Sequence, residues 1–222
     1  SSLAKYRQTF VPSRAKDDPT DAALAVDMLL RHPERFEALR PQGVDMRTLV
    51  TLVEQRRQLV SEKVRITNRL RAALKQYYPN ALEWFGHVDT MLFCDFIERW
   101  PTLVQAKRAR VNTLNRFFSA HNVRFAHVLE SRIAAIKESV PLTEDDAVII
   151  PYRMKALAMV KQLRTMLESI KVFDTEIDAV AMRHPDYELF HALPGAGRSL
   201  TPRLLAAFGE QRDRFTSAAE LQ

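Results

Sequence analysis

Residues 45–77 decide the fold, and their sequence is DMRTLVTLVEQRRQLVSEKVRITNRLRAALKQY. Apolar residues recur along this stretch at spacings of three, four or seven, which is the period of one face of an α-helix. The positions on this seam are Leu49, Leu52, Leu59, Ile66, Leu70, Ala73 and Tyr77. The pattern predicts a helix of roughly thirty residues, about 45 Å long, that follows a Pro41-Gln42-Gly43 turn and stops at Pro79.

A second long helical pattern extends from about Glu144 to Arg183, where His184-Pro185 ends it. Its seam consists of Leu157, Val160, Leu163, Leu167, Ile170, Ile177 and Ala181, and Pro151 is a possible kink near its start. Two long helices of similar length bury their seams best as an antiparallel coiled-coil arm, within one chain or between subunits. Arg56 and Lys63 interrupt the first seam, which predicts either a partner carboxylate or a frayed stretch.

Shorter helices are predicted on both sides of the first long one. Residues 18–32 have Asp18 as a candidate N-cap, Pro19 at the first helical position and His32-Pro33 as a stop signal. Three further candidates cover about 88–100, 102–120 and 124–139, and they form a small helical tip at about 80–140. No strand pattern stands out, so the predicted fold class is mainly α. Domain boundaries are expected after residue 42 and after residue 185.

The composition favours a basic, ordered protein without a disulfide framework. The chain has 33 Lys and Arg against 27 Asp and Glu, giving a net charge of +6, which makes nucleic acid the first partner to consider. Its single cysteine, Cys94, excludes an intramolecular disulfide and a thiolate zinc site, and the apolar residues around it predict a core position. No apolar run reaches the roughly 20 residues that span a bilayer. We therefore expect a cytoplasmic protein without a membrane partner.

Asp18 and Asp21 are the first candidate for chemistry. They are three residues apart at a helix start, so their carboxylates can share one side, with Cβ atoms about 5–6 Å apart. With further acids, such a pair can hold Mg²⁺ for attack on a phosphodiester. The alternative is an ordinary helix start, with Asp as N-cap, Pro at the first position and an acid in the first turn.

Positive charge on the first long helix is the second candidate. Five residues fall within roughly a 120° arc at about 100° per residue, away from the apolar seam. They are Arg47, Arg57, Arg65, Arg69 and Lys75, which we call the basic stripe. Such a stripe can follow a phosphate backbone, although an ordinary solvated helix face has the same pattern.

The stretch from Pro101 to Leu129 contains basic residues and no acid. The basic residues are Lys107, Arg108, Arg110, Arg116 and Arg124, with Phe117, Phe118 and Phe125 between them. This mixture suits phosphate contact and base stacking. The alternative is that the phenylalanines are ordinary core residues of the tip.

Residues 193–197, Leu-Pro-Gly-Ala-Gly, precede an apolar helical stretch that includes Leu204 and Leu205. This resembles a helix-hairpin-helix motif, in which Gly195 and Gly197 would bring backbone N–H groups to a DNA phosphate. A tight turn between two helices explains the glycines equally well. Other catalytic patterns are missing, because the histidines lack metal-ligand spacing and Ser199 lacks a nucleophile-elbow context.

The order of these motifs resembles the insertion-sequence one-ten transposases, the DEDD family of bridge-RNA-guided recombinases. Three stretches carry the resemblance: residues 15–22 (AKDDPTDA), residues 55–71 with QRRQL and TNRLR, and residues 193–215 from LPGAG to Arg214-Phe215. The resemblance implies that residues 1–42 end a RuvC-like, RNase-H-type catalytic domain. It further implies that 43–185 form the helical arm and that 186–222 begin a C-terminal transposase domain.

The resemblance also implies roles for individual residues. Asp18 and Asp21 correspond to the last two of four metal-binding acids, with an Asp and a Glu expected upstream of Ser1. The family's nucleophilic serine is expected beyond Gln222, so its role is not transferred to Ser199 or Ser217. The arm is expected to join subunits into a homo-oligomer and to bind structured guide RNA.

We therefore expect a transposase truncated at both ends, whose parent cuts and rejoins DNA while the fragment itself is inactive. Two other functions fit the same residues. One is a non-catalytic module that binds nucleic acid, and the other is an arm that only joins subunits.

Overall fold

A computed structural model of the chain describes residues 18–36, 40–123 and 125–211, and these residues contain helices and no strand. The mainly α fold class is thereby confirmed. Two compact units, Ser1–Gln42 and Gly43–Gln222, divide the chain. Within the described ranges, no helix is both long enough and apolar enough to cross a membrane.

The first unit contains helix α2, Asp18–Arg31, and a short 3₁₀ helix η1, Pro33–Arg35. The predicted stop at His32-Pro33 is confirmed, because the helix ends one residue before His32 and proline fixes a new turn. Leu24 is the one buried residue of α2, and the other apolar residues of this helix are half-buried or exposed.

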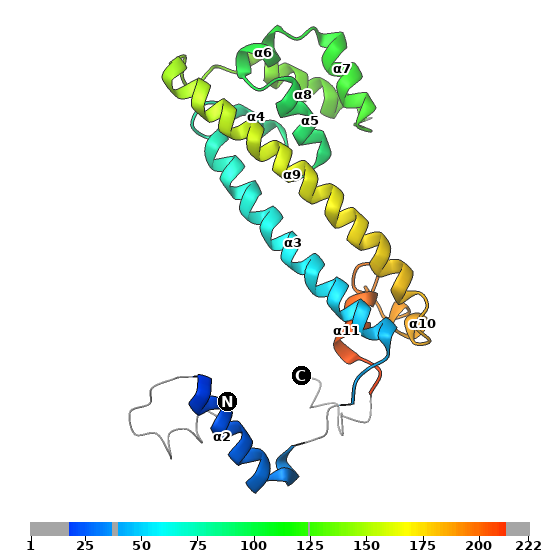
Figure 1. Cartoon of the computed structure of the whole chain (residues 1–222). Helices are drawn as coiled ribbons and strands as arrows, with labels where there is room; N and C mark the ends of the chain where they lie inside the picture. The colour runs from blue at the N-terminus through cyan, green and yellow to red at the C-terminus, as the bar shows by residue number, and fades with distance from the viewer. Residues whose placement is uncertain (1–17, 37–39, 124, 212–222) are drawn as a thin grey trace. The chain divides into compact units, whose positions relative to one another are not determined.

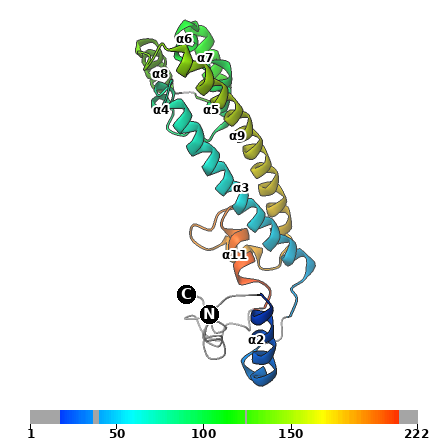
Figure 2. The same ribbon diagram turned by 60° about the vertical axis from the view of Figure 1, so that its left-hand side comes forward.

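The second unit is built on two long helices, α3 (Val44–Leu74) and α9 (Asp146–Ala181). They run antiparallel and side by side in both views, cyan against yellow in Figures 1 and 2. The pairing within one chain is the arrangement that buries seam residues of both helices, including Leu70 and Leu163. We call α3 and α9 together the helical pair. Helix α9 continues through Pro151 without a break.

The predicted length of roughly thirty residues is confirmed by the 31 residues of α3, but the predicted stop at Pro79 was wrong. Helix α3 ends at Leu74, and a turn leads through Pro79 into the short helix α4, Asn80–Trp84. The turn buries both Tyr77 and Tyr78, which adjacent positions on one straight helix cannot place on the same side.

Five short helices form the tip of the helical pair, and aromatic residues fill its core (Figure 1). They are α4, α5 (Met91–Arg99), α6 (Leu103–Arg108), α7 (Val111–Ala120) and α8 (Ala126–Glu138). Phe96 lies at the centre, with ring centroids 4.9–6.1 Å from Phe85, Trp100 and Phe118. Cys94 is fully buried in this core, which confirms its predicted place, and burial raises the pKa of its thiol to about 12.

The single helix predicted over 102–120 was wrong, because α6 and α7 are separated at Ala109 and Arg110, both in extended conformations. The break exposes carbonyl oxygens that Lys137 of α8 satisfies. Its ammonium donates to the carbonyls of Lys107 and Ala109, each at 2.5 Å. Ala106 of α6 and Leu114 of α7 are both fully buried in the core of the tip.

The opposite end of the helical pair has its own small core. Helices α10 (Tyr187–His191) and α11 (Thr201–Phe208) pack against α3 and α9, orange beside the cyan and yellow helix ends in Figure 1. The shared buried residues are Met46, Leu49, Ile177, Val180, Ala181, Tyr187, Phe190 and Leu205. Residues 186–211 therefore pack as one compact unit with the helical pair.

The two cations inside the first seam each have a partner carboxylate, which confirms one of the two alternatives predicted for them. Arg56 binds Asp174 across the pair, and the ammonium of Lys63 lies 2.6 Å from Asp89 Oδ2. The hydrogen bond from Lys63 holds the pKa of Asp89 below its usual value of 3.8. The first ion pair links α3 to α9, and the second links α3 to the segment before α5.

Candidate nucleic-acid interface

The basic stripe lies on the exposed side of α3, away from α9. All five of its side chains are exposed. Arg57 is bound by Glu54, with N–O distances of 2.7 and 2.8 Å, and this pairing lowers the pKa of Glu54 to about 2. Within the described residues the other four, Arg47, Arg65, Arg69 and Lys75, form no ion pair. Four unneutralised cations on one helix face are available to phosphates.

The basic residues predicted at the tip have different surroundings. Arg108, Arg110 and Arg116 are exposed, whereas the half-buried Lys107 donates a hydrogen bond to the Ser139 carbonyl at 2.7 Å. Lys107 therefore has a structural role in joining α6 to the end of α8. Arg124 lies outside the described residues.

The phenylalanines between these cations are mainly core residues. Phe117 and Phe118 are 5% and 0% exposed, so a base-stacking role for them is wrong and the core interpretation is confirmed. Phe125 differs, with 73% of its side chain exposed. Of the three, only Phe125 is open to a nucleobase.

The glycine hairpin joins α10 to α11. Gly195 has φ +81°, a conformation that disfavours side chains, and it turns the chain back toward α11. The turn is fixed from inside by Thr201, whose buried hydroxyl donates to the Ala196 carbonyl. Gly197 has neither constraint, because a Cβ there would meet nothing within 4 Å. Both glycines are exposed.

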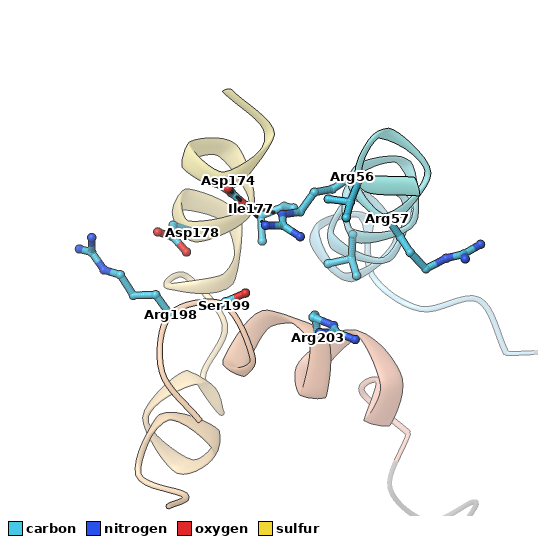
Figure 3. A pocket seen from close by; sticks show the side chains of 10 residues that line it. Arg56, Arg57, Asp174, Ile177, Asp178, Arg198, Ser199 and Arg203 are labelled. Carbon is cyan, nitrogen blue, oxygen red and sulfur yellow. Dashed lines mark hydrogen bonds and ion pairs between the residues drawn. The ribbon is translucent and has the colours of Figure 1, made fainter. Parts of the chain in front are cut away.

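The hairpin also closes a pocket of about 420 Å³ against the helical pair. Figure 3 shows the pocket between α3, α9 and the start of α11, with Arg203 rising between the two long helices. Its lining residues are Val53, Arg56, Arg57, Val60, Asp174, Ile177, Asp178, Arg198, Ser199 and Arg203. The sequence pattern did not point to Asp178, Arg198 or Arg203, because only the packing of α11 against α3 and α9 brings them together.

Asp18 and Asp21 lie in the first turn of α2, three residues apart on one side, as predicted. Asp18 is exposed and Asp21 is half-buried. Carboxylate oxygens are the ligands that Mg²⁺ prefers, so the chemistry of this pair fits the ion. No group of three or more His, Cys, Asp or Glu suited to a metal occurs within the ranges that the structure describes. The pair can therefore supply only part of a coordination sphere.

The helical pair presents the basic stripe, and α2 of the first unit presents the paired aspartates. A family model described as a transposase, for the DEDD transposases of IS110, matches residues 2–79. The match covers both aspartates and the whole of α3.

Named relatives agree with this family. The chain is 25% identical to the mini-circle putative transposase for IS117 of Streptomyces coelicolor, over 100% of this chain and 55% of the relative. It is 25% identical to an uncharacterised protein of insertion element IS110 from the same organism, over 95% of this chain and 51% of the relative. A putative transposase of Sinorhizobium fredii, y4uE, is 29% identical over 55% of this chain and 34% of its own length.

By these matches the chain is similar to transposases of the IS110 family, with residues 2–79 matching the family model. The chain spans about half the length of the first of these relatives. No solved structure matches it.

Proposed function

We propose that this chain is the arm-bearing part of a transposase that cuts and rejoins DNA when an insertion sequence moves, and that this part binds nucleic acid. The observation that carries the proposal is the group of four unneutralised cations on the outer face of α3. The names of the relatives support the transposase role. Basic residues on one rigid helix keep a fixed spacing, which suits a regular phosphate backbone.

The proposed partners are DNA and a structured guide RNA. The exposed tip residues Arg108, Arg110 and Arg116 extend the positive surface beyond the stripe. The open space at Gly197 supports a close approach of a phosphate to the hairpin backbone, since nothing inside the fold requires glycine there. We further propose that the helical pair acts as a coiled-coil arm in a cytoplasmic homo-oligomer, and that residues 186–222 begin a helix-hairpin-helix-like domain.

The proposed metal is Mg²⁺, held in part by Asp18 and Asp21 at the end of a RuvC-like domain. When bound, the ion would stabilise charge on the phosphate oxygens during strand cleavage. The two carboxylates provide fewer oxygens than the six that Mg²⁺ takes, and we propose that further acids complete the site in the intact protein. On this proposal the segment alone does not cut DNA.

The salt dependence of binding tests the proposal. The double variant Arg65→Gln/Arg69→Gln removes two cations of the stripe. A matched control, Lys161→Gln/Lys171→Gln, removes two exposed cations from α9. Each lost phosphate contact reduces the slope of log affinity against log salt by about 0.9 for duplex DNA.

We expect the stripe variant to bind a DNA duplex or structured RNA more weakly, with the slope for the duplex reduced by about two. The control variant should keep the slope of the unmodified protein. An equal loss of affinity in both variants would show that the basic stripe is not a specific binding surface. An affinity that does not change with salt concentration would show that the protein does not contact phosphates. Light scattering on the same samples measures the proposed homo-oligomer.

A further inference from the structure

The pocket at the glycine hairpin has the size and the walls of a ligand site. Its volume of about 420 Å³ lies in the range of about 300–1,000 Å³ that small-molecule sites occupy. Val53 and Val60 of α3 and Ile177 of α9 provide an aliphatic surface inside it. A flat apolar group can bury its faces there.

Some polar side chains of the pocket already have a bonding partner, and others do not. Arg56 and Asp174 bind each other, so neither is free for a ligand. The side chains of Asp178 and Ser199 have no hydrogen-bond or ionic partner among the residues that the structure describes. The pocket thus offers one uncommitted carboxylate and one uncommitted hydroxyl beside an apolar wall.

The rim of the pocket is positive. Arg57 and Arg198 extend outward on opposite sides of it, and Arg203 lies between α3 and α9 (Figure 3). Arg198 and Arg203 have no ionic partner in the described part of the chain. A strand that crosses the opening would meet the unpaired Arg198 and Arg203, and on the α3 side Arg57, which Glu54 already binds.

We propose that this pocket binds an unpaired nucleobase that projects from a nucleic-acid strand, with guanine preferred. The base packs on the aliphatic wall, and Asp178 accepts hydrogen bonds from the adjacent imino and amino groups that guanine presents together on its pairing edge. Pockets for extruded bases read that edge in this way. Arg198 and Arg203, the two unpaired arginines of the rim, bind the flanking phosphates. This inference rests on the proposed binding of nucleic acid and names the group that is bound.

The Asp178 carboxylate and the positive rim together favour guanine over other ligands. A free anion would be repelled by Asp178, and a wholly apolar ligand would leave that carboxylate without a partner. Uracil and thymine offer one imino donor flanked by carbonyl oxygens, which a carboxylate repels. Guanine combines two neighbouring donors with a negatively charged backbone, and it therefore matches both the carboxylate and the rim.

Binding of three RNA hairpins to the 222-residue protein tests the proposal. One has a single bulged guanosine, one has a bulged uridine, and one is fully paired. We expect the guanosine hairpin to bind about tenfold more tightly than the other two. Asp178→Asn should abolish that preference without changing affinity for the paired hairpin. Glu176→Gln, which changes an exposed acid on another face of α9, should keep it.

A second variant, Val60→Trp, fills the pocket from α3 and leaves Asp178 and the rim arginines unsubstituted. It should also remove the guanosine preference, and circular dichroism confirms that each variant remains helical. Equal binding of all three hairpins by the unmodified protein would overturn the base pocket while leaving the proposed function intact, as expected if the pocket holds a peptide. Failure of the paired hairpin to bind at low salt would reject the proposed function, and the pocket inference with it.

Discussion

Arg164 of α9 donates a hydrogen bond from Nη2 to Asp95 Oδ1 of α5 at 2.5 Å, and this contact ties the tip to the long helix. The other oxygen of Asp95 lies 2.7 Å from Nε2 of His121, the residue that follows α7. His121 Nδ1 lies 2.8 Å from the Phe117 carbonyl oxygen, so both ring nitrogens face acceptors. Burial disfavours charge on Asp95, but the hydrogen bonds from His121 and Arg164 outweigh it and keep its pKa below the usual value.

Arg164→Met is expected to destabilise the protein by about 1 kcal/mol. Arg164 also donates to Glu98 at 2.6 Å, and hydrogen bonds to charged groups contribute about 1.5–3 kcal/mol, a figure that the partial exposure of these groups reduces. Urea denaturation measures the difference. The control Lys161→Met changes an exposed cation of the same helix that has no partner in the described structure, and it should be neutral. Equal stabilities for the two variants would show that the contact contributes nothing.

Acid should remove the contribution of the Lys63–Asp89 pair. The folded-state pKa of Asp89 is lowered, first by the hydrogen bond from Lys63, so the unfolded chain takes up the proton first as pH falls. The stabilisation is therefore complete well above pH 3.8 and is lost as pH falls from there through the folded-state value. The stability gap between the unmodified protein and Asp89→Asn should be clear at pH 7 and smaller at pH 3. A gap that widens in acid would contradict this assignment.

The spacing of apolar residues in the sequence predicted the two long helices. Contacts between residues far apart in the sequence decide features such as the break between α6 and α7. The apolar spacing of α3 and α9 repeats over many helical turns. One charged residue within it, such as Arg56, therefore does not hide the helical period. The break between α6 and α7 depends on Lys137, which lies 28 residues beyond Ala109 and leaves no local signal. For the candidate site, the arc of the basic stripe follows from helix geometry. The Asp178 pocket follows only from the way α11 folds back.

Phe118→Ala and Phe125→Ala should separate the two classes of aromatic residue at the tip. Phe118 is fully buried, and truncation of a buried Phe costs about 3–5 kcal/mol, part of it from the cavity left behind. Phe125 is 73% exposed, so its truncation should change stability by about 0.5 kcal/mol or less. Thermal or urea denaturation measures both. If Phe125 stacks on a base, its variant should weaken RNA binding while remaining stable.

Asp18→Asn and Asp21→Asn, each made in the intact transposase, should separate a metal site from a helix start. Asn caps a helix about as well as Asp, so a purely structural role predicts a folded and fully active protein. A metal ligand role predicts loss of DNA cleavage and strand transfer with little change in thermal stability, because Asn lacks the negative charge that binds Mg²⁺. Asp27→Asn is the matched control, because Asp27 lies on the same helix, bound to Arg31 at 2.7 Å, and should leave activity intact. Full strand transfer by both variants would assign the two aspartates to the helix start.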